Sequence, residues 1–122
     1  MIQPLIQSLR PAQWTKNVFV LAPLVFGGLL LDRSALLRGL LAFATFCAAA
    51  SSVYLVNDLR DREEDRKHPL KRLRPLAAGT LTVPVALAAL AALAGLALAA
   101  AWRLGPGFTA ILLGYLALNL LY

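Results

Sequence analysis

Residues 39–57 carry no charged side chain, and five of the six acidic residues of the chain fall directly after them, within 58–65. A helix over 39–57 is about 28 Å long, which is close to the roughly 30 Å thickness of the hydrocarbon core of a bilayer. The pattern therefore predicts a membrane-spanning helix that ends in an acidic cluster at the membrane surface.

The composition favours a membrane protein over a soluble domain. Hydrophobic residues make up 60% of the chain and charged residues only 15%, as in integral membrane proteins. Apolar runs predict four spans, at 18–31, 39–57, 83–102 and 108–122, with a polar loop at 58–80 after the second. We therefore expect an all-α, multi-span transmembrane helical bundle.

The last apolar run is short. Residues 108–122 reach only about 22 Å at helical rise, less than a full crossing. Because no cap, glycine or basic flank follows, we expect the chain to be the N-terminal part of one transmembrane domain, ending inside a helix.

The basic residues are distributed unequally between the two predicted sides. Nine of the twelve Lys and Arg residues lie in 1–17 or 58–80, and three lie on the other side. The positive-inside rule then places the acidic cluster on the cytoplasmic side of a plasma (inner) membrane. Because seven of the twelve are concentrated between Arg60 and Arg74, next to an apolar segment, nucleic-acid binding is a poor interpretation.

The acidic cluster has helical spacing. If the helix continues to about residue 67, Asn57, Asp58, Asp61 and Asp65 share an arc about 100° wide. Carboxylates on one face repel each other unless cations lie between them, and hard oxygen ligands suit Mg²⁺. We therefore predict that Asp58, Asp61 and Asp65 bind Mg²⁺ and that Asp58 and Asp61 act in catalysis.

The basic loop that follows could bind phosphate. A protein-bound Mg²⁺ often completes its coordination with substrate phosphates, and Lys71, Arg72 and Arg74 are placed to contact outer phosphate oxygens. Such a site would activate a diphosphate leaving group at the membrane surface. Lys16 has two interpretations, a phosphate contact or an anchor at the membrane interface.

A solvated helical face is the alternative explanation of the charge run. Pairs such as Glu63 with Lys67 are common on exposed helices. This alternative explains the alternating charges but not the shared arc of the three Asp residues. Glu63 points away from that arc and is expected to lie outside the site.

These residues resemble a known family. The segment Asn57-Asp58-x-x-Asp61-x-x-x-Asp65, followed by Arg74-Pro75-x-x-x-Gly79, is similar to the first Asp-rich region of the UbiA superfamily of intramembrane prenyltransferases. Two further segments resemble its decaprenyl-phosphate phosphoribosyltransferase branch. They are Arg10-Pro11-x-x-Trp14-x-Lys16-Asn17 and His68-Pro69-x-Lys71-Arg72-x-Arg74-Pro75.

The resemblance implies a bundle of roughly nine helices around a cavity, of which this chain would supply the first four. It implies Mg²⁺-dependent transfer of 5-phosphoribosyl from phosphoribosyl diphosphate to a polyprenyl (decaprenyl) phosphate, in the synthesis of cell-wall arabinan precursors. It also implies that Asn57, Lys16, Lys71, Arg72 and Arg74 bind substrate. A homo-oligomer is compatible with this interpretation.

Two other functions stay open. One is an aromatic prenyltransferase of the same superfamily that uses a prenyl diphosphate. The other is a non-enzymatic four-span membrane protein. Because the family has a second Asp-rich region further along the chain, we expect residues 1–122 alone to be inactive.

Overall fold

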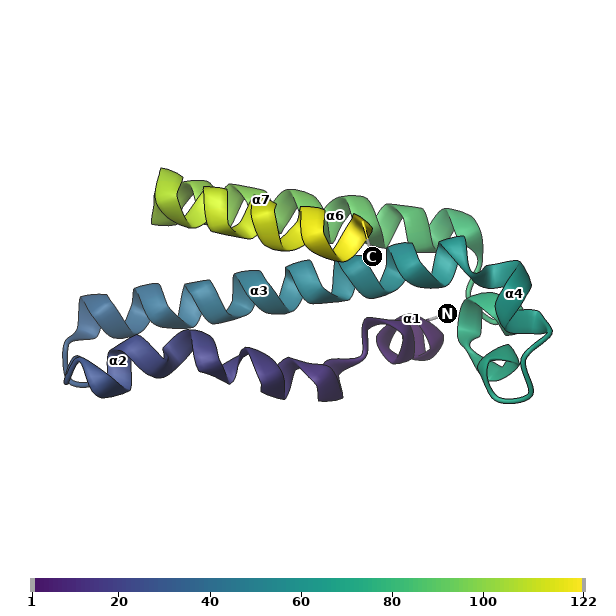
Figure 1. Cartoon of the computed structure of the whole chain (residues 1–122), viewed down its shortest axis with the longest axis horizontal. Helices are drawn as coiled ribbons and strands as arrows, with labels where there is room; N and C mark the ends of the chain where they lie inside the picture. The colour runs from purple at the N-terminus through teal and green to yellow at the C-terminus, as the bar shows by residue number, and fades with distance from the viewer. Residues whose placement is uncertain (1, 122) are drawn as a thin grey trace.

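The computed structural model describes residues 2–121, and within that range every regular element is a helix. The expected all-α architecture is confirmed. Two of the helices, α3 (Arg33–Arg60) and α6 (Val83–Leu104), are long and apolar enough to cross a membrane, and α7 (Pro106–Leu121) is a shorter apolar helix. The three lie lengthwise beside one another (Figure 1).

Small side chains hold α3 against α6 and α7. Ala49 of α3 is buried with Ala97 and Ala101 of α6 and Leu112 of α7. Alanines let the helix backbones approach closely, which favours packing where apolar burial alone cannot drive association, as in lipid. Phe46 adds edge-to-face contacts with Phe108 and Tyr115 in α7, at centroid distances of 5.5 and 5.3 Å.

The N-terminal region consists of three short elements, the last two of which overlap the bent span predicted at 18–31. They are α1 (Ile2–Leu9), the 3-10 helix η1 (Pro11–Leu21) and α2 (Ala22–Phe26). Pro23 contributes to the change in helix type, because it has no N–H to donate to the preceding turn. In Figure 1, η1 and α2 run along α3, and α1 lies near the end of α3 that leads into α4.

The predicted loop at 58–80 folds into three short helical segments. These are α4 (Arg62–Arg66), η2 (Lys71–Leu73) and α5 (Pro75–Ala78). Gly79 ends α5 with φ +85°, a left-handed conformation that glycine adopts without steric cost. Leu76 and Leu81 are buried against Leu55 of α3, so this segment is packed on the end of the long helix.

Candidate functional site

The end of α3 holds a buried carboxylate. The side chain of Asp58 is only 2% exposed, and its Oδ1 accepts a hydrogen bond of 2.7 Å from Nη2 of Arg10. Nη1 of Arg74 lies 3.5 Å from the same oxygen. Burial raises the pKa of the Asp58 carboxyl above its ordinary value, and the two guanidinium groups oppose that rise because they stabilise the carboxylate.

The helix is interrupted at Asp61. This residue has φ −94° and ψ 7°, so α3 ends at Arg60 and α4 begins at Arg62. The prediction of one continuous helix to about residue 67 is therefore wrong at this position. Nε of Arg66 donates to the carbonyl of Ala77 in α5 at 3.0 Å, a tertiary contact that holds α4 on α5 after the break.

The break changes how the three Asp residues are placed. Asp65 is buried like Asp58, and its Oδ2 accepts a hydrogen bond from Nη1 of Arg74 at 3.2 Å. Asp61 is exposed. Nη1 of Arg74 thus lies within 3.5 Å of two buried carboxylates, those of Asp58 and Asp65. Asp61 differs from these two residues because it is exposed to solvent.

Arg10 is held in an unusual conformation. It has φ 52°, in the left-handed region that non-glycine residues rarely adopt. Its guanidinium carbon lies 4.7 Å from the centre of the Tyr54 ring, and Ser51 Oγ donates to the carbonyl of the preceding residue, Leu9, at 2.8 Å. Strain of this kind, held in place by its surroundings, is concentrated at functional sites.

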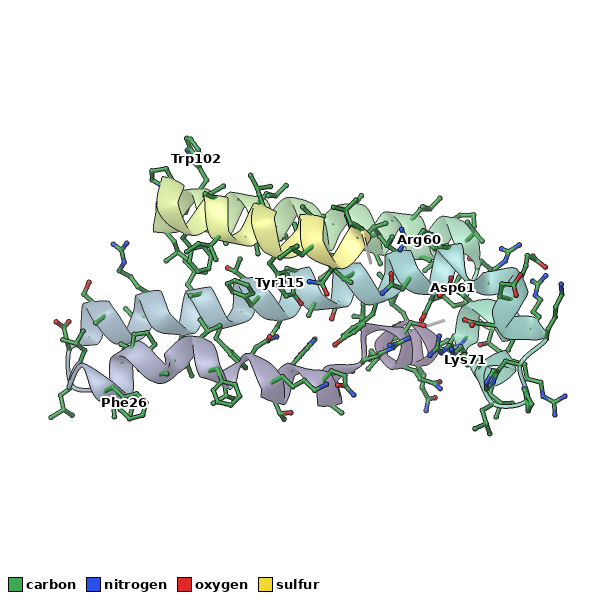
Figure 2. The ribbon with its side chains drawn as sticks, in the orientation of Figure 1. Phe26, Arg60, Asp61, Lys71, Trp102 and Tyr115 are labelled. Atoms are coloured by element: carbon green, nitrogen blue, oxygen red, sulfur yellow. The ribbon has the colours of Figure 1, made fainter. Side chains whose placement is uncertain are left out.

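A polar cavity of about 390 Å³ adjoins these residues. It is lined by four cationic side chains, one carboxylate and two amides: Arg10, Asn57, Arg60, Asp61, Lys71, Arg74 and Asn119. Figure 2 shows Arg60, Asp61 and Lys71 at the same end of the bundle. The lining has an excess of positive charge, which suits an anionic ligand such as a phosphate or diphosphate.

Four of the predicted site residues line this cavity, namely Asn57, Asp61, Lys71 and Arg74. Asp58 and Asp65 are not in its lining and lie buried under Arg10 and Arg74. Lys16 and Arg72 are exposed and outside the lining. Their assignment as substrate contacts stays a prediction.

Glu63 lies outside the lining of the cavity. It pairs with Arg66 at 3.0 Å and Arg62 at 3.4 Å, and its side chain is 67% exposed. The solvated-face interpretation therefore fits this one acidic residue, although its partners are not the Lys67 suggested by the sequence.

The cavity also includes residues that sequence reasoning missed. The sequence pattern assigns no role to Arg10, although this residue lies in one of the family-like segments, and it places Arg60 only in the charge run. Asn119 comes from α7, where hydropathy alone gave no sign of a polar contribution. Arg60 donates to the carbonyl of Leu120 at 3.0 Å, which ties the end of α3 to α7.

Whether the site suits a metal ion can be judged from its donors. Across residues 2–121, no group of three His, Cys, Asp or Glu side chains converges closely enough to hold one. Two buried carboxylates do share a single cationic nitrogen, that of Arg74. Their oxygens lie 3.5 and 3.2 Å from that nitrogen, whereas a Mg²⁺–oxygen bond is about 2.0–2.1 Å long, so these side chains as they stand do not form a Mg²⁺ site. The assignment of all three Asp residues as ligands stays a prediction.

An apolar groove runs beside the N-terminal region. A hollow of about 260 Å³ is lined by Trp14, Phe43, Ala44, Cys47, Ala48 and Leu93. Cys47, Ser51, Tyr54 and Asp58 lie on one face of α3, and each contacts the 10–17 segment. This face leads from the groove towards the buried carboxylate.

Comparison with known proteins gives a consistent result. Residues 20–122 match the family described as the UbiA prenyltransferase family. Decaprenyl-phosphate phosphoribosyltransferase of Mycobacterium tuberculosis is 44% identical over 126 residues, which cover 100% of this chain and 42% of that protein. The protein of the same name from Corynebacterium glutamicum is 44% identical, over 97% of this chain and 37% of its own.

A relative with a different name also matches. The nodulation protein NoeC of Azorhizobium caulinodans is 37% identical over 95% of this chain and 38% of its own length. The chain thus spans about two fifths of the length of these curated relatives.

Proposed function

The chain belongs to the UbiA prenyltransferase family, a family of integral membrane transferases, and from this membership we propose that the protein transfers a 5-phosphoribosyl group from phosphoribosyl diphosphate to a polyprenyl phosphate. The names of the relatives from Mycobacterium tuberculosis and Corynebacterium glutamicum support the choice of this reaction within the family. The product would be a polyprenylphosphoryl ribose 5-phosphate, a precursor for cell-wall arabinan.

The polar cavity is the observation that carries this proposal. Its lining places four cationic side chains, Arg10, Arg60, Lys71 and Arg74, around one exposed carboxylate, Asp61. One guanidinium group can contact two phosphate oxygens at once, and the ammonium group of Lys71 acts as a point charge. A donor that carries a diphosphate and a separate phosphate would compensate this excess of positive charge.

The reaction needs a good leaving group. A phosphate oxygen of the lipid attacks C1 of the ribosyl donor, the bond from C1 to the diphosphate oxygen breaks, and the diphosphate leaves with the bonding electron pair. Lys71, Arg74 and Arg60 would stabilise the negative charge that develops on the diphosphate. Mg²⁺ held by Asp58, Asp61 and Asp65 would neutralise more of that charge when bound, and its binding would require these three side chains to move closer together than they are in the structure.

The acceptor would reach the site from the membrane. The apolar groove lined by Trp14, Phe43 and Cys47 offers a surface for a prenyl chain, and the polar face of α3 leads from it to the cavity. The excess of Lys and Arg at 1–17 and 58–80 supports a cytoplasmic position for the cavity, in the inner membrane, where phosphorylated metabolites are present.

The test is a donor and acceptor assay with the intact protein in detergent. We expect Mg²⁺-dependent formation of a lipid-linked ribose phosphate from phosphoribosyl diphosphate and decaprenyl phosphate. Asp58→Asn and Asp61→Asn should abolish the activity, whereas the matched change Glu63→Gln should leave it near that of the wild type. Consumption of prenyl diphosphate with an aromatic acceptor, but not of phosphoribosyl diphosphate, would replace this function with the prenyltransferase alternative.

A further inference from the structure

The side chain of His68 orders the turn that follows α4. Its ring Nδ1 accepts hydrogen bonds from the backbone N–H groups of Leu70 and Lys71, both at 3.1 Å. Its carbonyl oxygen accepts a third hydrogen bond, from the N–H of Arg72 at 3.2 Å. Because Pro69 has no N–H to donate, His68 accepts hydrogen bonds from all the backbone N–H groups at 69–72.

Hydrogen bonds, and not apolar packing, give this turn its shape. Every side chain from 67 to 73 is exposed, and those of Leu70 and Leu73 are 74% and 68% exposed. The N–H of Leu73 donates to the carbonyl of Leu70 at 3.2 Å, as expected in a short 3-10 segment with few internal hydrogen bonds. The ring of His68 therefore orders a stretch of backbone that no buried side chain holds.

This turn carries one of the four cationic side chains of the cavity. Lys71 lines the polar cavity, whereas His68 lies outside the lining. Arg74 is the other lining residue of this segment, and its guanidinium group has anchors of its own in Asp65 and Asp58. Lys71 has no such anchor among the ion pairs of the described residues 2–121. A change at His68 should therefore affect the placement of Lys71 more than that of Arg74.

We propose that His68 is a positioning residue of the donor site, whose ring nitrogen holds the backbone of Lys71 so that the ammonium group faces the diphosphate of the donor. The proposal rests on the proposed function for the identity of this ligand. Without the ring, the turn would sample other conformations, and the apparent affinity would fall with the fraction that presents Lys71 to the cavity. This role requires neither a metal ion nor a contact between His68 and the ligand.

Two substitutions of His68 test whether the acceptor atom matters. Asparagine places an oxygen as many bonds from the backbone as Nδ1 of histidine, and Asn side chains commonly accept from a backbone N–H two residues further on. Alanine has no acceptor. The probe is inorganic diphosphate, whose binding to the intact protein in detergent is measured by calorimetry with a chelator present to remove divalent cations. We expect His68→Ala to bind about fivefold more weakly than the wild type, and His68→Asn within about twofold of it.

A double variant tests whether His68 acts through Lys71. In the Lys71→Gln background, His68→Ala should cause no further loss, because the effects of two residues that act as one unit are not additive. The matched control is Leu73→Ala, which removes an exposed side chain from the same turn but none of its hydrogen bonds, and it should leave the affinity unchanged. If His68→Ala does not fold, His68→Gln, whose acceptor lies one bond further out, replaces it in the comparison with His68→Asn.

The transferase assay gives an independent measurement. Because a bound diphosphate would draw the turn back to its ordered conformation, the effect of His68→Ala should fall on binding. We expect the KM for phosphoribosyl diphosphate to rise about fivefold with little change in kcat. A loss confined to kcat would contradict a role in positioning the binding site.

The other outcomes overturn the proposal in distinct ways. Wild-type affinity in His68→Ala would refute the positioning role and leave the transferase function standing. Equal losses in His68→Ala and His68→Asn would show that the acceptor atom is not what matters, and a full further loss in the Lys71→Gln background would show that His68 does not act through Lys71. A wild type that binds no diphosphate would refute both the anion site and the role of His68. The predicted affinities in a protein that does not use phosphoribosyl diphosphate would support the role of His68 and refute the proposed donor.

Discussion

Removing the charge of Arg10 should destabilise the fold by about 2–3 kcal/mol. Deleting one partner of a buried ion pair costs about 3–5 kcal/mol, because the remaining charge is left uncompensated. Two features of the structure lower this figure. Arg10 is 30% exposed, so water already screens part of the interaction, and Arg74 remains 3.5 Å from Oδ1 of Asp58.

The measurement is the free energy of unfolding of the intact protein in mixed detergent, followed by circular dichroism. Arg10→Gln keeps a hydrogen-bonding side chain but removes the charge. The matched control is Arg62→Gln, whose partner Glu63 is 67% exposed at 3.4 Å, and it should cost less than about 0.5 kcal/mol.

A double variant isolates the cause. Arg10→Gln combined with Asp58→Asn removes both charges, so it should be more stable than Arg10→Gln alone by about 1–2 kcal/mol. If the second change instead added a further loss, the cost would not come from an uncompensated Asp58 carboxylate. The contribution of Arg10 would then lie in its packing on Tyr54.

Two further predictions concern the cavity and the N-terminal segment. Lys71→Gln should weaken the binding of inorganic diphosphate in the presence of Mg²⁺ by roughly tenfold, as measured by calorimetry. The control Lys67→Gln changes a residue outside the cavity lining and should leave this affinity unchanged. Equal losses in the two variants would show that only the net charge of the protein matters. Ser51→Ala removes the hydrogen bond that Ser51 accepts from Trp14 and the one that it donates to the carbonyl of Leu9. It should therefore destabilise the protein by about 1–3 kcal/mol. A change below about 0.5 kcal/mol in the same unfolding experiment would show that these hydrogen bonds do not stabilise the fold.

The long helices could be predicted from the sequence because their signal is local. The uncharged run at 39–57 and the Ala and Leu run at 83–102 fall within α3 and α6. The N-terminal region was less readable, because Pro11 and Pro23 indicate an interruption without fixing the type of helix. The 3-10 helix η1 packs against α3, and a local sequence pattern does not contain such a tertiary contact.

The break at Asp61 shows a second limit. Residues 58–66 contain neither proline nor glycine, so helical spacing was a reasonable extrapolation across them. The contacts that accompany the break are tertiary: Arg66 donates to the carbonyl of Ala77, and Arg74 bonds to Asp65. The place of Asn57 at the cavity was predictable, because it follows from the position of this residue in α3. The place of Asp65 was not, because it depends on these tertiary contacts.

Arg10 and Asn119 could not be assigned to the site from local sequence for the same reason. Arg10 reaches Asp58 across 48 positions of sequence, and Asn119 enters the cavity only because α7 packs back along α3. The cavity therefore depends on the packing of the N-terminal segment, the end of α3, the η2–α5 segment and α7. An anion bound among its four cations would contact several of these segments at once. Because a ligand stabilises whichever state binds it, occupancy of the cavity should strengthen the packing of these segments, in addition to placing a substrate.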